Sequence, residues 1–426
     1  MSSVCSLKVE SSRDDMEIKK QYDVVVIGAG PAGAVSAALL NSAGLDVAVF
    51  ERTRFPRFVI GESLLPICND VLQEAGLFER VESQGYQVKT GAVFLRNGEI
   101  CEYDFSEQFT KGASWTWQVP RAEFDSVLVD GIKDQGVSVF FEHGVTDVQF
   151  GDTQTVSVES VDGSQTDVEC RFVVDASGYG RVLPRLLDLN QTSALANRKS
   201  LFAHVTGDQR PEGLNSGRIW IIVHEGGAWL WVIPFSDGRT SFGAVAAPEF
   251  YEQFPSDPAE CLKAIIKSDP HASSRLSDIE LEFEPVAIEG YSIGVKQLFG
   301  DGYCLVGNAT EFLDPVFSSG VSLALQSASR ASNAIIRQLN GESVDWQTDY
   351  ADYMARGIDT FRTFVNAWYD ESLHKVFFSS EMNAPLKKMI CSALAGYVWD
   401  LENPFVGRHE RKLSQLIRII EATEDE

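Results

Sequence analysis

The chain has 426 residues, and its 61 acidic side chains outnumber the 36 basic ones by 25. Because a net charge of −25 repels phosphate groups, nucleic acid and anionic membranes are excluded as expected partners. Seven dispersed cysteines and six histidines form no metal-binding cluster, so we expect no metal site and a cytoplasmic protein. No apolar run approaches the roughly 20 residues that span a bilayer. The length suits two or three domains.

The first 20 residues are polar and are predicted to form a disordered tail. Residues 23–27 are a continuous run of mainly branched apolar side chains, which indicates a strand buried on both faces. A helix of small residues is expected over 34–42, and a second strand over 46–50. These elements form the β-α-β unit of about 30 residues that is typical of nucleotide-binding domains.

The segment Gly28-Ala29-Gly30-Pro31-Ala32-Gly33 joins the first strand to this helix. Gly28 permits a tight turn, Gly30 lets a pyrophosphate approach the backbone, and Gly33 lets the helix pack on the strand. Glu51 lies 21 residues after Gly30, where a carboxylate can accept hydrogen bonds from a ribose. A glycine-rich turn alone would be weak, but the whole ordered pattern predicts a dinucleotide at a helix N-terminus.

Further elements follow in chain order. Strands are expected over 138–142, 155–161 and 168–174, a second sheet over 215–223, 228–234 and 240–247, a short strand over 303–306, and a helix over 319–339. From residue 346 the apolar side chains recur at helical spacing.

Two segments indicate which dinucleotide binds. Residues 172–178 and 303–309 resemble the later FAD-contacting motifs of the flavoprotein monooxygenase superfamily. The resemblance implies FAD contacts at Asp175 and Asn308, although the second position is often Asp in that superfamily. Arg121 matches a further flavin-holding position, and its alternative is an ordinary arginine at a helix start. The expected fold is α/β: a Rossmann-like FAD-binding domain of the glutathione-reductase type, an inserted β-sheet substrate domain and a helical C-terminal region.

The domain boundaries follow from these patterns. The FAD-binding domain is expected over 21–200 and 290–340, with 85–120 contributing to a substrate chamber. The β-sheet domain is expected over 201–289 and the helical region over 341–426. Because only one dinucleotide fingerprint is present, reduced flavin is expected from a partner reductase. The oligomeric state stays open.

The segment Trp229-Leu230-Trp231-Val232-Ile233-Pro234 resembles the Trp-x-Trp-x-Ile-Pro signature of flavin-dependent halogenases. Residues 61–66 and 312–321 match that family too, and the resemblance spans about residues 21–340. It implies a wall between flavin and substrate made by Trp229, Trp231, Ile233, Pro234 and Phe317. Alternation along a strand places both tryptophans on one face, although such a pair is often core packing.

Lys89 lies in a stretch, residues 87–94, that resembles the segment carrying the catalytic lysine of pyrrole and phenol halogenases. The resemblance implies that Lys89 orients hypohalous acid beside an aromatic carbon, as an ammonium or, after burial lowers its pKa, as an amine. The alternative is a solvated surface lysine. Tryptophan halogenases carry a glutamate at the position of Phe317, so the chain is placed nearer the phenol and pyrrole branch.

The turn Ser318-Ser319-Gly320 matches the halide site of these halogenases, where N–H groups at a helix start would hold the anion. The alternative is a turn that only supports the flavin. The resemblance implies cofactor contacts at Gly28, Gly30, Ala32, Gly33, Glu51, Arg52, Glu62, Ser63, Arg121, Asp175, Asn308, Gly320 and Val321.

The predicted function is an FADH2-dependent halogenase with O2 and chloride or bromide as co-substrates. A flavin hydroperoxide would yield hypohalous acid, which Lys89 would direct to a phenol-like or pyrrole-like ring, free or tethered to a carrier protein. Three alternatives stay open: a flavin hydroxylase or epoxidase, an alkene reductase of the geranylgeranyl-reductase type, and a flavin-binding redox sensor or carrier-protein-binding module without turnover.

Overall fold

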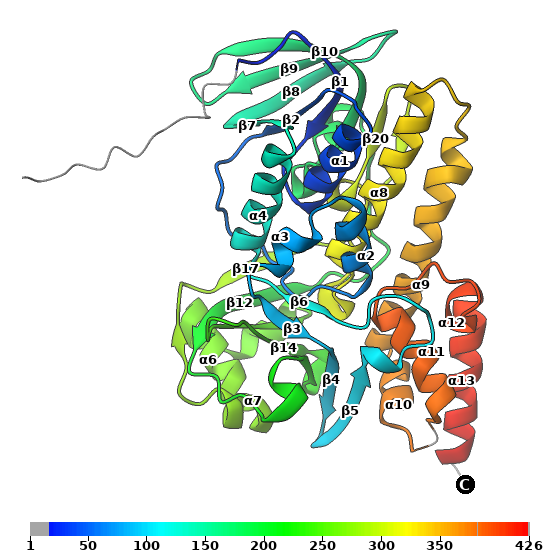
Figure 1. Cartoon of the computed structure of the whole chain (residues 1–426). Helices are drawn as coiled ribbons and strands as arrows, with labels where there is room; N and C mark the ends of the chain where they lie inside the picture. Colours follow the sequence, from blue (N-terminus) through cyan, green and yellow to red (C-terminus); the bar gives the residue numbers. More distant parts are fainter. Residues whose placement is uncertain (1–16, 381, 425–426) are drawn as a thin grey trace, which may run out of the picture.

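The computed structural model describes residues 17–380 and 382–424 (Figure 1). Most of the predicted disordered tail therefore lies outside the described residues. Two sheets stand one above the other in Figure 1, and the C-terminal helices lie beside the lower sheet. Within the described ranges no helix is both long and apolar enough to cross a membrane.

The upper sheet has eight strands among the described residues. Five of them run parallel in the order β20-β10-β1-β2-β7, with β19 at one edge and β8 and β9 extending β10 in antiparallel fashion. Their bounds are β1 Gln21–Ile27, β2 Val47–Glu51, β7 Ser138–Phe141, β8 His143–Gln149, β9 Gln154–Ser160, β10 Gln165–Asp175, β19 Phe299–Gly300 and β20 Tyr303–Leu305.

Alternating residues of β1 enter two different cores, as predicted for a strand buried on both faces. Val24 and Val26 pack with the helices, whereas Val25 and Ile27 face the β8–β9 side. The helices are α1 Pro31–Ser42, α2 Ile67–Glu74, α3 Phe78–Glu82, α4 Arg121–Asp134, α5 Val182–Leu186 and α8 Ser319–Leu339. Helix α1 follows β1 after three residues and packs along α8, so the glycine-rich turn lies at the carboxyl edge of the sheet.

The lower sheet has the order β16-β12-β15-β14-β13-β4-β5, with β17 also paired to β12. Its bounds are β4 Gly91–Arg96, β5 Glu99–Asp104, β12 Lys199–Thr206, β13 Ile219–Val223, β14 Trp229–Pro234, β15 Thr240–Ala246, β16 Glu280–Leu281 and β17 Val286–Glu289. Strand β13 begins later than the predicted residue 215 because Gly213–Ser216 form a 3-10 turn. Strands β4 and β5 come from the 85–120 segment, so that segment supplies one edge of this sheet.

The two faces of β14 serve different purposes. Leu230 and Val232 pack under α6 (Pro258–Ser268) and α7 (Pro270–Arg275), whereas Trp229 and Trp231 join the core that also contains residues of α1 and α8. The remaining short pairs are β3 Gln87–Lys89 with β6 Thr116–Gln118, and β11 Asn190–Thr192 with β18 Ile293–Val295. The predicted alternation is therefore confirmed, and it aims the tryptophans at the gap between the two sheets.

Five helices make up the C-terminal part, beginning with α9 (Asp352–Tyr369), which runs down the side of the molecule in Figure 1. The others are α10 Ser372–Phe378, α11 Ala384–Leu394, α12 Pro404–Gly407 and α13 His409–Glu424. Apolar side chains of α9 such as Phe361 and Phe364 join the main core. The α/β fold class with a helical C-terminal region is confirmed, and the exact domain boundaries stay a prediction.

Candidate active site

The glycine-rich turn forms a cradle that side chains would fill. A Cβ atom on Gly33 would lie 1.9 Å from the carbonyl oxygen of Gly28, and one on Gly28 would lie 2.7 Å from that of Ala176. Gly28 also has a φ of +96°, which disfavours any side chain. The N-terminus of α1 therefore meets the end of β1 with its backbone exposed to a ligand, as a bound pyrophosphate requires.

Glu51 is fixed beside this cradle at the end of β2. Its carboxylate accepts hydrogen bonds from the backbone N–H groups of Ala29 and Thr53, each at 3.0 Å. Glu51 Oε1 also accepts the Thr53 hydroxyl at 2.6 Å. A carboxylate oxygen accepts two such bonds, so room for a ribose hydroxyl remains at Oε2. Ala32 is buried in the same turn, and Arg52 follows as an exposed side chain. The residues present fit the adenosine half of FAD.

Three other predicted cofactor residues bind the protein itself. The buried Asp175 carboxylate accepts the N–H groups of Ser177 and Leu183 at 2.8 and 2.7 Å. Arg121 holds Asp125 at 2.8 Å and donates to the carbonyl of Gly61 at 3.3 Å. The carbonyl of Asn308 accepts from Arg181 at 3.2 Å. The Asp175 and Arg121 side chains and the Asn308 backbone therefore organise the loops of the site, and direct contacts of these residues with FAD stay a prediction.

A pocket between the two sheets gathers most of the predicted halogenase residues. It encloses about 70 Å³. Its lining residues are Ile60, Gly61, Glu62, Ser63, Ile219, Trp229, Trp231, Ile233, Phe312, Pro315, Ser318, Gly320 and Val321. Three segments far apart in the sequence thus meet in one central pocket, as the three matching motifs predict.

Lys89 reaches this central pocket through Ser63. It lies at the end of β3 with only 1% of its surface exposed, so the solvated alternative is wrong. Its ammonium donates to Ser63 Oγ at 2.8 Å and to the carbonyl of Leu64 at 2.7 Å, and lies 5.6 Å from the ring centre of Phe105. Burial lowers the pKa of Lys89 to about 7 because the ammonium has lost its water. Both protonation states are therefore accessible near neutral pH.

The predicted halide turn lies at the start of α8. Ser318 adopts a left-handed backbone with φ of +57°, and α8 begins at the next residue. The first N–H groups of any helix have no partner within it, so the start of α8 offers donors to an anion beside the pocket. A Cβ on Gly320 would come within 2.9 Å of the Phe312 ring, which explains the glycine.

The tryptophan wall is tied to this turn by hydrogen bonds. Trp229 Nε1 donates to the Tyr369 hydroxyl at 3.1 Å, and Tyr369 donates to Asp314 Oδ2 at 2.8 Å. Asp314 Oδ1 accepts from Val316 N–H at 2.9 Å and so shapes the turn before Ser318. Burial raises the pKa of Asp314 to about 6. Sequence patterns do not single out Tyr369, which lies outside the matching motifs.

The remaining wall residues are buried as well. Trp231 donates to Ser241 Oγ at 3.0 Å, and its ring centre lies 5.9 Å from that of Trp229. Pro234 closes β14, and Phe317 packs edge-on against Phe364 and Trp368 of α9, with ring centres 6.2 and 6.0 Å away. Aromatic side chains of β14, of the turn before α8 and of α9 are therefore buried together around the central pocket.

A buried carboxylate–imidazole pair completes the pocket. Glu62 Oε1 lies 2.6 Å from His204 Nε2, and Glu62 Oε2 is buried without a hydrogen-bond partner. Sequence patterns indicate no partner for His204, because β12 lies 142 residues after Glu62. An open carboxylate oxygen in the pocket fits a ligand that carries N–H groups, as the flavin ring does.

Residues 21–358 match the family model for the FAD binding domain, so the fold and the cradle define an FAD-dependent flavoprotein. The 1H-pyrrole-2-carbonyl-(peptidyl-carrier protein) chlorinase of Pseudomonas fluorescens is 30% identical over 95% of this chain and 94% of its own. A flavoprotein/dehydrogenase from Cytophaga hutchinsonii is 47% identical with a TM-score of 0.93, covering 95% of this chain and all of the other. The flavin-dependent brominase Bmp2 is 26% identical with a TM-score of 0.81, covering 95% and 99%.

The chain belongs to the flavin-dependent halogenase family. The predicted family, the FAD-dependent enzyme class and the preference for halogenation over the hydroxylase, reductase and non-enzymatic alternatives are confirmed by these relatives. The roles of individual side chains follow from the geometry above and are proposed below.

Proposed function

We propose that this protein transfers chlorine or bromine to an electron-rich ring of the pyrrole type that is tethered to a carrier protein. The support for the substrate is the similarity to a pyrrole-carbonyl carrier-protein chlorinase over nearly the whole chain. Phe317 adds to it, because an apolar side chain at the position where tryptophan halogenases carry a glutamate leaves no carboxylate there to pair with Lys89. Bound FAD, reduced by a partner flavin reductase, supplies hypohalous acid from O2 and halide.

The buried Lys89 carries the proposal. An ammonium has three N–H donors, and Ser63 and Leu64 accept two of them. The third donor remains for the oxygen of a hypohalous acid, which places its halogen beside a ring carbon. A pKa near 7 also gives a substantial neutral fraction, and its lone pair can carry the halogen as a haloamine. Lys89 is therefore the catalytic residue of this proposal.

The turn at the start of α8 is the proposed halide site. Ser318 Oγ and the N–H groups of Ser319 and Gly320 would hold chloride or bromide at the positive end of a 21-residue helix. The Asp314 carboxylate is turned toward Val316, Tyr291 and Tyr369, so its charge is held by donors. Trp229, Trp231 and Ile233 form the wall that keeps the ring away from the flavin and water away from the oxidised halogen.

We also place the protein in the cytoplasm. All six cysteines among the described residues are free and buried, as expected in a reducing compartment. One of them, Cys68, lies near Lys89, and burial raises the pKa of its thiol to about 12. The thiol is therefore neutral and forms no ion pair with the lysine.

Mass spectrometry of reaction products tests the proposal. The FAD-loaded protein is given a flavin reductase, NADH, O2, bromide and pyrrole-2-carbonyl carrier protein, with catalase to remove free peroxide. We expect a product that carries the paired isotope peaks of bromine, and none when bromide is omitted. A product 16 mass units heavier without bromine would show an oxygenase instead. A ring that reacts equally well as the free acid would contradict the carrier-tethered substrate.

A further inference from the structure

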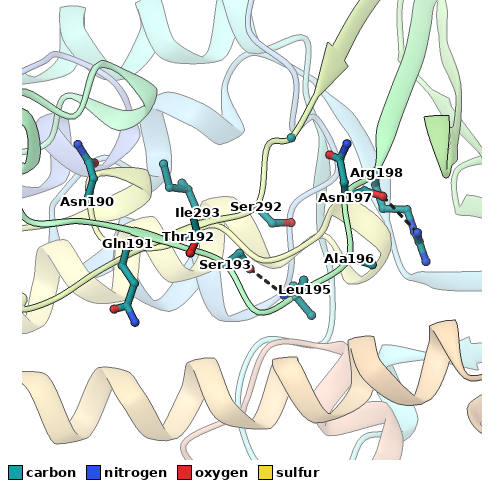
Figure 2. Close-up of a pocket in the computed structure, with 11 residues that line it drawn as sticks. Asn190, Gln191, Thr192, Ser193, Leu195, Ala196, Asn197, Arg198, Ser292 and Ile293 are labelled. Carbon is teal, nitrogen blue, oxygen red and sulfur yellow. Dashed lines mark hydrogen bonds between the residues drawn. The ribbon is translucent and has the colours of Figure 1, made fainter.

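A second pocket opens beside the site, between the segments 190–198 and 290–293 (Figure 2). Its volume is about 390 Å³. The lining residues are Asn190, Gln191, Thr192, Ser193, Leu195, Ala196, Asn197, Arg198, Gly290, Ser292 and Ile293. None of them is acidic and only Arg198 is charged, although the chain carries 61 acidic residues. This groove, the Arg198 groove, therefore combines a largely apolar lining with several uncharged polar side chains and one cation.

Arg198 lies at one end of the groove in Figure 2 with donors to spare. Its guanidinium carbon lies 4.3 Å from the ring centre of Tyr369, and Nη1 donates to the carbonyl of Asn197 at 3.2 Å. Nε is buried and has no hydrogen-bond partner within the part of the chain that the structure describes. Over the described parts of the chain no carboxylate forms an ion pair with Arg198, and the neighbouring Glu289 is held by Asn197 Nδ2 at 3.0 Å. A fixed cation with open donors suits a phosphate oxygen.

Two contacts connect the Arg198 groove to the central pocket. Tyr369, which stacks on Arg198, hydrogen-bonds Trp229 of the wall at 3.1 Å. Ile293 of the groove exchanges backbone hydrogen bonds of 3.0 and 3.1 Å with Phe312 of the central pocket. A ligand in the groove is therefore separated from the site by single layers of side chain and backbone.

Two further pockets lack this combination. One is lined by Glu102, Asp104, Glu107 and Glu212, which repel an anion. The other contains Asp359 and Glu410, and its Arg362 is already paired with Glu311 at 2.6 Å. Of these pockets, the Arg198 groove alone presents an unpaired cation without a neighbouring carboxylate in its lining.

We infer that the Arg198 groove binds the 4′-phosphopantetheine arm of a tethered substrate, with the phosphate on Arg198. The inference rests on the proposed function. The arm combines one phosphate with two amides, and the groove combines one guanidinium with the side-chain amides of Asn190, Gln191 and Asn197. The arm would then bring the ring to the layer of Tyr369 and Trp229, which must shift before the ring can enter the central pocket. Coenzyme A carries the same arm, so carrier protein and coenzyme A are the two possible sources.

Calorimetric binding to the FAD-loaded protein tests the groove without turnover. Acetyl-4′-phosphopantetheine is compared with acetyl-pantetheine, which lacks the phosphate. A charge-assisted phosphate contact predicts at least about tenfold tighter binding of the first ligand. Arg198→Gln should remove that ratio and Arg198→Lys should restore part of it, whereas Arg185→Gln, a change at an exposed arginine outside the groove, should keep it. Equal affinity for both ligands in the unmutated protein would overturn the inference.

A turnover assay identifies which molecule carries the arm, and it tests the proposed function independently of the groove. Pyrrole-2-carbonyl is offered on holo-carrier protein, on coenzyme A and on pantetheine without phosphate. Arg198→Gln should raise KM about tenfold for the phosphate-bearing substrate that reacts, with kcat and the FAD affinity within about twofold of the unmutated protein. If Arg198→Gln halogenates the tethered ring with an unchanged KM, or if its FAD affinity falls as much as its KM rises, the inference about the Arg198 groove is wrong and the proposed function stands. If binding depends on the phosphate but no substrate is halogenated, the proposed substrate is wrong and the inference about the Arg198 groove stands.

Discussion

Lys89 and Asp314 are two buried ionisable groups that serve the central pocket in opposite ways. Both have lost their water, and in both cases burial favours the neutral form: it lowers the pKa of Lys89 to about 7 and raises that of Asp314 to about 6. Among the described residues Lys89 has two acceptors, Ser63 and Leu64, for three N–H groups. Asp314 receives three donors, from Val316, Tyr291 and Tyr369.

This difference in hydrogen bonding shows which of the two groups is free to bind a ligand. A buried polar group with all its bonds made rigidifies its surroundings, whereas one with a bond left over can take a ligand. Lys89 has one donor to spare beside the pocket, so we assign it the reaction. Both oxygens of Asp314 accept hydrogen bonds, from Val316 in the turn before Ser318 and from Tyr369. We therefore assign Asp314 a structural role in the halide turn and the tryptophan wall.

Replacing the lysine should give the largest effect. In Lys89→Ala the hypohalous acid loses its only oriented donor, so we expect halogenated product to fall by about a hundred- to ten-thousandfold. Product is measured by mass spectrometry in the presence of catalase. NADH-dependent O2 consumption should change by less than about twofold, because the cradle at Gly28 and Glu51 is untouched. Lys267→Ala, at an exposed lysine, serves as the control, and equal product from both variants would refute the assignment.

The pH dependence of stability should report the burial of Lys89 directly. Its folded pKa of about 7 lies below the unfolded 10.5, so between these values the unfolded chain binds more protons and stability rises with pH. The unfolding free energy of the unmutated protein relative to Lys89→Met should therefore rise by about 4 to 5 kcal/mol from pH 7 to 10.5 and stay flat below pH 7. Urea unfolding at matched FAD saturation measures it. A flat difference across the whole range would mean that Lys89 is hydrated.

Asp314 should show the opposite slope in a lower window. Its folded pKa of about 6 lies above the unfolded 3.8, so the folded state binds more protons between them and stability falls as pH rises. Relative to Asp314→Asn, the unmutated protein should lose about 2 kcal/mol from pH 4 to 6. Asp152→Asn, at an exposed carboxylate, should show no such slope. A slope of the same sign and size in that control would leave Asp314 without a special role.

The smallest effect concerns the hydroxyl that joins wall and turn. Tyr369→Phe leaves the indole N–H of Trp229 without its acceptor and removes one donor from Asp314. We expect a loss of about 1 to 3 kcal/mol in unfolding free energy, from urea midpoints at pH 7. Tyr179→Phe changes a ring that is 49% exposed and should cost less than about 0.5 kcal/mol. Equal costs would show that the hydrogen-bonded chain adds no stability.

Local patterns were sufficient for the FAD cradle and the tryptophan face. Gly28, Gly33 and Glu51 lie within one β-α-β unit, so strand, turn and helix chemistry place them without knowledge of the rest of the chain. The alternation along β14 likewise separates Trp229 from Leu230. The central pocket was predicted because three segments of the chain resemble halogenase motifs, and the residues of each motif follow its local conformation.

Contacts between distant segments could not be predicted in the same way. Glu62 and His204 are 142 residues apart, and Arg198 meets Tyr369 only because the start of β12 and the end of α9 lie side by side. No periodicity links such residues in sequence. Asp175 shows that a local motif can also leave a role undecided. Its motif implies a cofactor contact, whereas in the structure its two oxygens accept N–H groups of the loop up to Leu183. Burial of Lys89 likewise depends on the pairing of β3 with β6.

The central claim is that Lys89 captures the oxidised halogen, and the most direct measurement is where that halogen goes. FAD-loaded protein turns over bromide with the tethered pyrrole and a small dissolved trap for hypobromous acid, in the unmutated and Lys89→Ala forms. We predict brominated pyrrole and little brominated trap from the unmutated protein, and the reverse from Lys89→Ala at a similar rate of O2 consumption. Brominated pyrrole in undiminished yield from Lys89→Ala would contradict the account.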